Sequence, residues 1–245
     1  MTAHRILPLA FVGAALFASA SALADDYRVE VRLAGEHVNG SDGADDIDAF
    51  QARGTFYLEP VRTDGLPLAE AAFLNRSSYA SVSATRVDLG DDITQLGASL
   101  GYYLPDTIFF GRLGVTHTDY GPGNDTNWNG TFGVTPFDGL LLTTDFDEDG
   151  WDPNVAAKYV GKLANSHYYA VTARAVDPDG GDTAVGLDFD YFLDLTFKVG
   201  GGFDSGDDRF TARTEKFFTP SFSVGAAVYS GDDDSGFGAQ VAWRF

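Results

Sequence analysis

The final segment of the chain, residues 235–245, alternates between apolar and mainly polar side chains. The apolar set contains Phe237, Ala239, Val241, Trp243 and Phe245, and the other set contains Gly238, Gln240, Ala242 and Arg244. Because successive side chains on a β-strand point to opposite faces, the segment predicts a strand with one apolar, aromatic-ended face and one polar face. This pattern favours a strand with lipid on one side and water on the other.

Alternation of the same kind recurs along most of the chain. The clearest segments are 27–33, 50–58, 95–102, 109–116, 140–146, 155–163, 169–175, 185–191, 195–203, 210–214 and 222–228. Segments of about ten residues with a period of two are typical of the strands of transmembrane β-barrels. A closed barrel can cross a bilayer because closure pairs every backbone N–H and C=O group. The pattern therefore predicts an all-β fold, a transmembrane antiparallel β-barrel.

The connections between these segments are of two kinds that alternate. Short connections with few acids occur at 104–106, 135–137, 163–166, 192–194 and 218–220, and acidic, Gly-rich connections occur at 39–46, 88–92, 119–126, 147–153, 177–182, 204–208 and 231–235. Outer-membrane barrels have short periplasmic turns and longer external loops, so we expect the acidic set to face outward. The alternation gives about 14 strands with both termini periplasmic. A count of about 12 stays open, because residues 127–147 fit one strand or two and residues 79–87 alternate poorly.

One connection does not follow this rule. Residues 61–77 are long, yet they fall where a short periplasmic turn is expected, and residues 68–74 could form a helical turn. Two interpretations are open: a turn with a packed, plug-like segment, or a segment that folds into the pore mouth and narrows it.

The start of the chain has the organisation of a secretory signal peptide. His4 and Arg5 are basic, residues 6–17 form an apolar run, and residues 22–24 have the A-x-A pattern of a cleavage site. The run is shorter than the roughly 20 apolar residues that span a bilayer. We therefore expect residues 1–24 to be removed after Ala24 and residues 25–245 to form a single outer-membrane barrel domain of a Gram-negative bacterium.

The composition agrees with strands and turns. The chain has 29 Gly, 20 Phe and 11 Tyr against a single Met, and it has no Cys that could carry a lipid or a disulfide. No later stretch approaches 18 consecutive apolar residues, which excludes a helical membrane protein. A secreted β-sandwich also alternates and stays open as an alternative. However, its core face would usually avoid Gly at positions such as 111, 130, 161 and 201.

The side chains opposite the apolar faces carry most of the basic charge. Removal of Arg5 with the signal peptide leaves 15 of the 16 basic residues and all 36 acidic residues, a net charge of about −21. The inward basic residues are Arg28, Arg32, Arg53, Arg112, Lys158, Lys162, Arg174, Lys198, Arg209, Arg213 and Arg244, and the inward acids are Glu30, Asp145, Asp188, Asp190, Asp204 and Glu215. Lumen placement alone is expected, because Lys or Arg at the midplane of the lipid face costs roughly 2–4 kcal/mol. A barrel of 12 to 14 strands is wider than the roughly 8-stranded barrels that side chains fill, so we expect a water-filled, pore-lining basic wall that weakly favours anions.

Metal and catalytic motifs are weak. Asp145, Asp147, Asp149 and Gly150 match the opening of an EF-hand loop, but Ala156 occupies the position of the bidentate Glu, so solvated turns explain these acids better. Of the histidines that follow the signal peptide, His37 and His117 lie near strand ends, with His167 elsewhere. No H-E-x-x-H pair or phosphate loop occurs. The sequence predicts no enzyme, no cofactor and no nucleic-acid partner.

Several short motifs resemble the general bacterial porin family, the small outer-membrane porins of Gram-negative proteobacteria. They are residues 67–74 (PLAEAAFL), 190–193 (DYFL), 217–220 (FFTP) and 243–245 (WRF). The resemblance implies a pore for passive diffusion of small hydrophilic solutes and ions, with outer-membrane lipid, lipopolysaccharide and the barrel-assembly machinery as partners. It also implies that Trp243 and Phe245 form the assembly signal and that the protein is a homo-trimer or a monomer. The alternatives are a structural or adhesive barrel that acts through its loops and, third, an outer-membrane hydrolase.

Overall fold

The computed structural model describes residues 26–40, 46–88, 92–147, 154–164, 167–176, 183–232 and 234–245. The predicted signal peptide, residues 1–24, lies outside the described residues, as do most of the acidic connections at 147–153 and 177–182. In the described part of the chain, no helix is long and apolar enough to cross a membrane.

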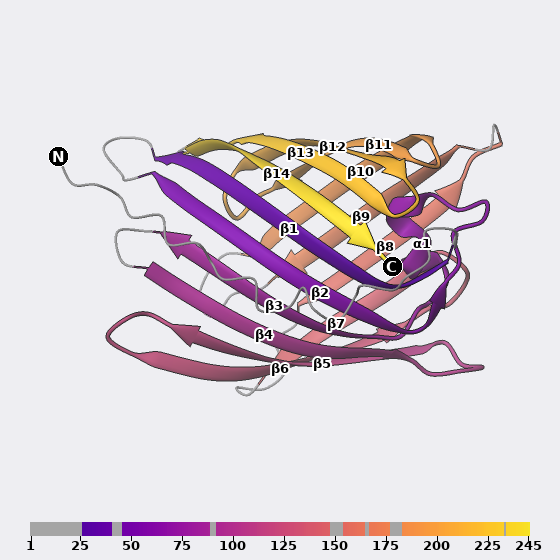
Figure 1. The fold of residues 1–245 in the computed structure, drawn as a ribbon, viewed down its shortest axis with the longest axis horizontal. Coiled ribbons are helices and arrows are strands. Elements are labelled where there is room, and N and C mark those ends of the chain that lie inside the picture. The colour runs from indigo at the N-terminus through magenta and orange to yellow at the C-terminus, as the bar shows by residue number, and fades with distance from the viewer. Residues whose placement is uncertain are drawn as a thin grey trace.

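The described residues form 14 antiparallel strands that close into one barrel. The strands are β1 (Tyr27–Gly40), β2 (Ile47–Val61), β3 (Tyr79–Asp88), β4 (Asp92–Tyr103), β5 (Phe109–Asp119), β6 (Asn124–Val134), β7 (Leu140–Asp147), β8 (Val155–Lys162), β9 (Tyr168–Val176), β10 (Ala184–Asp194), β11 (Phe197–Asp204), β12 (Arg209–Thr219), β13 (Phe222–Ser230) and β14 (Asp234–Arg244). Each strand pairs with its neighbours in the chain, and β1 pairs with β14 to complete the ring (Figure 1). The prediction of 14 strands is confirmed: residues 127–147 belong to two strands, and the poorly alternating segment 79–87 lies in β3.

Apolar side chains of this barrel face outward, the reverse of a soluble protein. On β10, Leu187 is 53% exposed and Phe189 is 49% exposed, whereas Asp190 between two apolar neighbours is buried at 7%. On β12, Phe210 is 64% exposed and Glu215 is 2% exposed. Such a surface is stable only against a hydrocarbon phase, because exposed apolar area costs about 25 cal/mol per Å² in water.

Aromatic pairs ring the outside of the end where the short connections lie, which we call the short-turn end. Phe222 packs on Phe218 at 6.2 Å and on Trp243 at 5.6 Å between ring centroids. Further round, Tyr159 lies 6.0 Å from Phe137 and 5.8 Å from Tyr169. Outward aromatic belts of this kind mark the interface between hydrocarbon and headgroups in membrane barrels. The opposite end, which carries the acidic connections, is the loop end.

The alternation predicted for β1 is wrong at its first residue. The β1–β2 register shifts between Tyr27 and Val29, and Tyr27 is 5% exposed, with its ring 5.5 Å from that of Tyr57. The irregularity reverses the faces at this end, so Tyr27 lies inside rather than toward lipid. Arg28, predicted inside, is exposed at the rim, where its guanidinium reaches the carbonyl of Leu58 at 3.4 Å.

The long connection between β2 and β3 folds back against the inside of the barrel at the short-turn end. We call residues 62–78 the plug. It contains a 3-10 turn, η2 (Leu68–Glu70), and one turn of helix, α1 (Ala71–Leu74), which lies near the C-terminus in Figure 1. Ala71 is fully buried in a cluster with Tyr27, Tyr57 and Val61. On the other side, Phe73 and Leu74 pack against a cluster of Val160, Tyr168, Ala170 and Phe192.

Candidate functional site

The inner faces of β9–β12, β14 and β1 carry one continuous series of ion pairs, which we call the charge ladder. It runs Asp204–Arg174 (2.8 Å), Arg174–Asp188 (3.1 Å), Asp188–Arg213 (2.5 Å), Arg213–Asp190 (2.9 Å), Asp190–Lys198 (3.6 Å), Lys198–Glu215 (3.8 Å), Glu215–Arg32 (3.5 Å), Arg32–Glu30 (3.2 Å) and Glu30–Arg244 (2.7 Å). Cations and carboxylates alternate along the series and are equal in number. The ladder is therefore neutral as a whole.

Glycine allows ladder members on non-adjacent strands to meet. In the cross-strand register, Gly200 of β11 lies between Asp190 of β10 and Arg213 of β12. A Cβ at residue 200 would occupy the space of the Asp190 carboxylate. Gly186 lies in the same way between Arg174 and Asp204, and a Cβ there would lie 2.5 Å from Arg174 Nε. The side chains thus lie flat against the wall over bare backbone.

Burial makes the pairing of the ladder obligatory. Glu215, Arg244 and Asp190 are 2%, 5% and 7% exposed. Ser223 of β13 donates a further hydrogen bond to Glu215 at 2.9 Å, and the Arg244 guanidinium lies 4.4 Å from the ring centroids of both Tyr27 and Phe217. A buried charge that loses its partner keeps its desolvation penalty, so these pairs hold the wall in one arrangement.

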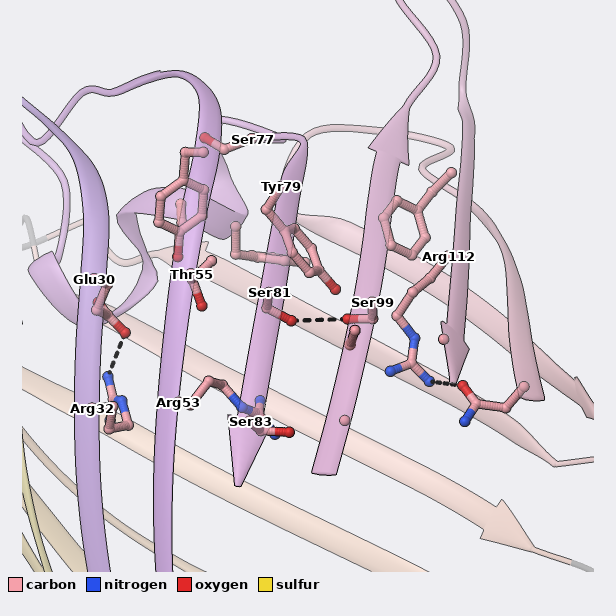
Figure 2. Close-up of a pocket in the computed structure, with 18 of the residues that line it drawn as sticks. Glu30, Arg32, Arg53, Thr55, Ser77, Tyr79, Ser81, Ser83, Ser99 and Arg112 are labelled. Atoms are coloured by element: carbon pink, nitrogen blue, oxygen red, sulfur yellow. Dashed lines mark hydrogen bonds and ion pairs between the residues drawn. The ribbon is translucent and has the colours of Figure 1, made fainter. Parts of the chain in front are cut away.

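The opposite wall is built differently. The inner faces of β2–β6, which we call the hydroxyl wall, line a cavity of about 580 Å³ with serine and threonine hydroxyls, aromatic rings and the guanidinium groups of Arg53 and Arg112. Arg32 of β1 also lines this cavity. The serine and threonine side chains of the wall are Thr55, Ser81, Ser83, Ser99 and Thr116. Figure 2 shows Arg53 of β2 and Arg112 of β5 reaching into this cavity from either side of the serine side chains. Ser81 and Ser99 are hydrogen-bonded to each other at 2.9 Å.

The two arginines of the hydroxyl wall have no ion pair to a carboxylate among the described residues. Arg112 donates from Nε to Thr131 and from Nη2 to Asn129, each at 3.3 Å, and these neutral contacts orient its guanidinium. Thr131 in turn donates to Asp145 at 2.5 Å, so this carboxylate reaches Arg112 only through the hydroxyl. Glu30 also lines the cavity, but Arg32 and Arg244 already engage it. Two uncompensated positive charges of the lumen therefore lie on this wall, and Lys162 at the short-turn end of β8 has only the Tyr168 ring as a described contact.

A second cavity of about 450 Å³ lies between the ladder side and β1–β2, and Gln51 lines both cavities. Arg209 and Tyr229 contribute to it. Arg209 forms an ion pair with Asp234, and its guanidinium lies 4.8 Å from the Tyr229 ring centroid. The shared residue makes the two cavities neighbouring parts of one lumen, whose lining mixes charged and polar side chains with alanine, glycine and aromatic residues.

Polar contacts fix the plug to several strands. Lys158 of β8 forms an ion pair with Glu70 at 2.6 Å, and Arg244 donates to the carbonyl of Leu68 at 3.0 Å. The Tyr168 hydroxyl donates to the carbonyl of Gly65 at 3.1 Å. Glu70 is 6% exposed, so its ion pair with Lys158 is shielded from water.

Three further basic residues predicted inside, Lys158, Lys162 and Arg209, lie outside the ladder and the hydroxyl wall. Lys162 is at the short-turn end of β8, with its ammonium 5.4 Å from the Tyr168 ring centroid. Sequence reasoning missed the acids that neutralise Lys158 and Arg209, namely Glu70 in the plug and Asp234 at the start of β14. The sequence predicts a packed or pore-narrowing segment at 61–77 but no ionic role for Glu70, and it places Asp234 in a loop. The available signal in the sequence was that acids and glycines recur at every second residue on the inward faces of β10 and β11, which indicates carboxylates lying over glycine.

The structure does not bring the candidate metal-binding and catalytic residues together among the described residues. In the part of the chain that the structure describes, no group of three His, Cys, Asp or Glu side chains could hold a metal ion, and Asp149 lies outside that part. His37 lies 2.8 Å from Asp48, and His117 lies 2.7 Å from the Thr126 hydroxyl. Residues 97–101 (GASLG) have the spacing of a nucleophile motif, but they lie within β4 rather than at a strand-to-helix turn, which that motif requires.

Solved structures share this fold. No protein-family model matches the chain, and no curated protein matches its sequence. The outer membrane protein Omp33 of Acinetobacter baumannii is 24% identical, with a TM-score of 0.75 over 90% of this chain and 99% of that one. The fold is that of a bacterial outer-membrane β-barrel. A bacterial polysaccharide outer membrane secretin has a TM-score of 0.52 at 8% identity, over 89% of this chain and 99% of its own. The KdgM porin has a lower TM-score of 0.44 at 10% identity, over 88% of this chain and 99% of that porin.

Proposed function

We propose that the chain is an outer-membrane porin, a water-filled channel for passive diffusion of small hydrophilic solutes and ions. The observation that carries this proposal is the polar lumen. Two adjoining cavities of about 580 and 450 Å³ lie inside a barrel of 14 strands, and charged, amide and hydroxyl side chains line them together with alanine, glycine and aromatic residues. Barrels of about eight strands are filled by their own side chains, whereas wider ones leave space that polar walls keep wet.

The proposed orientation places the short-turn end in the periplasm and the acidic connections outside, toward lipopolysaccharide. Trp243 and Phe245 belong to the aromatic belt of the short-turn end, and the Phe245 carbonyl accepts hydrogen bonds from Arg28 N at 2.7 Å and Val29 N at 3.0 Å. This position at the seam of the barrel supports a role for the last strand in recognition by the assembly machinery.

We also propose that the channel prefers anions, and that this preference arises on one wall. The idea of a uniformly basic wall needs revision, because the charge ladder and the pairs Lys158–Glu70 and Arg209–Asp234 neutralise most of the predicted cations. Arg53 and Arg112 on the hydroxyl wall, with Lys162 at the short-turn end, remain as the sources of positive potential. The plug, which lies across the short-turn end, narrows the route that solutes take.

Planar-bilayer recordings of the purified full chain in KCl test the proposal. We expect discrete conductance steps and a reversal potential, in a KCl gradient, on the anion-selective side. The recording is repeated with Lys158→Met, which weakens attachment of the plug. If neither form conducts while both are folded by circular dichroism, the porin proposal is wrong and a structural or adhesive barrel replaces it.

A further inference from the structure

The cavity of the hydroxyl wall has an excess of hydrogen-bond donors that the protein itself does not satisfy. Among the described residues, no side chain or backbone carbonyl accepts a hydrogen bond from the Arg53 guanidinium, which is exposed to the cavity. Arg112 uses Nε and Nη2 for Thr131 and Asn129, which leaves its Nη1 edge toward the cavity. An oxyanion is the partner that matches such a planar fork, because two parallel N–H groups meet its two oxygens.

The register separates the two guanidinium groups. Across the sheet, Arg53 is aligned with Ser83 of β3, Gly97 of β4 and Thr116 of β5, so Arg112 originates three strands away and four residues along β5 from that line. At about 4.8 Å per strand, their backbones are more than 10 Å apart, and their side chains approach the cavity from two sides. Figure 2 shows the hydroxyls of Ser81, Ser83 and Ser99 in the space between them. One small oxyanion would occupy one arginine, and a molecule with two would reach both.

We propose that this cavity is a binding site for small dicarboxylate anions on their way through the barrel. One carboxylate would bind Arg53 and the other Arg112, and the short carbon chain between them would lie along the serine hydroxyls. The volume of about 580 Å³ accommodates such a molecule together with water. Arg32, the ladder cation that lines this cavity, already pairs with Glu30 and Glu215, so it does not compete for the solute.

Isothermal titration calorimetry of the full chain in detergent at low ionic strength tests this site with succinate, acetate and inorganic phosphate as probes. We expect succinate to bind saturably, with one molecule per barrel, and at least about tenfold more tightly than acetate or phosphate, because charge-assisted hydrogen bonds form at both ends. Arg53→Gln or Arg112→Gln should each reduce succinate affinity to the level of acetate.

Two variants serve as matched controls. Arg28→Gln removes one positive charge at the exposed rim, and Arg174→Gln with Asp204→Asn removes the two ion pairs of Arg174 from the ladder without changing net charge. Both should leave succinate affinity within about twofold. Circular dichroism confirms that each variant is folded.

The proposal is overturned if Arg53→Gln and Arg112→Gln bind succinate as the parent chain does, or if succinate binds no more tightly than acetate and phosphate. The inference rests on the proposed porin only for the route by which solute reaches the cavity. Calorimetry needs no conductance, so the two can fail separately. Ion conductance without succinate binding removes the site and leaves the porin, and binding without conductance removes the porin and leaves the site.

Discussion

The two walls of the lumen handle charge in opposite ways. On the ladder side, every cation of the series touches a carboxylate, and the side chains lie flat over glycines such as Gly200. On the hydroxyl wall, Arg53 and Arg112 stand among serines and threonines with no carboxylate partner among the described residues. On the ladder side, the charges pair with one another and stabilise the barrel, whereas on the hydroxyl wall the guanidinium groups stay available to solutes. Inward position alone therefore does not make a charged residue functional.

Breaking one rung of the ladder should have the largest effect on stability. Asp190→Ala removes a carboxylate that is 7% exposed and pairs with Arg213 and Lys198. We expect the free energy of unfolding to fall by about 3 kcal/mol, because Arg213 and Lys198 each lose one of their two carboxylate partners. Urea titration followed by tryptophan fluorescence measures it. Asp138→Ala, whose exposed ion pair with Arg76 lies outside the ladder, should leave the unfolding midpoint unchanged; an equal loss there would contradict the distinction.

The second prediction compares the loss of stability when one methyl group is added to a glycine on each wall. Gly200→Ala places a Cβ against the Asp190 carboxylate and 2.6 Å from the Phe189 carbonyl oxygen, so we expect a loss of about 1–3 kcal/mol in the same titration. Gly97→Ala on the hydroxyl wall meets Ser83 Oγ at 2.7 Å, and the hydroxyl can rotate away, which should cost under about 1 kcal/mol. Gly111→Ala, which meets nothing within 4 Å, is the control for strand propensity. Equal costs at 200 and 97 would show that the ladder is not tightly fitted.

Removing charge from the hydroxyl wall should alter the ion selectivity of the channel, and removing an ion pair from the ladder should not. A unit charge about 8 Å away is worth about 0.5 kcal/mol in water, and it acts on chloride and potassium with opposite sign. Removing two such charges with Arg53→Gln and Arg112→Gln changes the difference between the two ions by about 2 kcal/mol, so the chloride-to-potassium permeability ratio should fall by up to roughly thirtyfold. Neutralising the ladder pair Arg174 and Asp204 together should leave that ratio nearly unchanged, since no net charge is lost. Reversal potentials in a KCl gradient measure both. A larger change in the ladder variant than in the arginine variant would mean that the ladder, and not the hydroxyl wall, sets the ion selectivity.

The smallest expected effect concerns the plug. Lys158→Met leaves the Glu70 carboxylate shielded and unpaired, which favours movement of the plug away from β8 and should raise single-channel conductance by about twofold. Lys162→Met is matched to it, because Lys162 lies on the same face of β8 and contacts the Tyr168 ring rather than a carboxylate. A rise in the Lys162 variant alone would mean that the plug does not limit the current.

The faces of the strands could be predicted from the sequence because a period of two is a local property of the chain. Leu187, Asp188 and Phe189 have the sides that the alternation predicts. The partners could not be predicted, because they depend on register across three strands. Arg213 meets Asp190 only because β10, β11 and β12 align these residues with Gly200 between them.

Local irregularities also escaped prediction. The reversal at Tyr27 follows from the pairing of this residue with Val61 after a register shift, which no pattern within β1 indicates. The same holds for the plug, whose length was visible in the sequence but whose contacts with Lys158 and Arg244 come from strands far along the chain. These features depend on pairing between distant segments, which cannot be read from the local pattern of side chains.

The position of Arg244 has a consequence for the order of folding. This residue joins Glu30 near the start of the described chain, Leu68 in the plug and Phe217 on β12, so its contacts link segments that are very distant in sequence. Contacts of such separation form late, because the entropy of closing a long loop is lost before they form. Closure of the barrel therefore adds the last of the polar contacts to the plug, and a chain whose last strand has not yet docked holds its plug through other contacts, among them those with Lys158 and Tyr168.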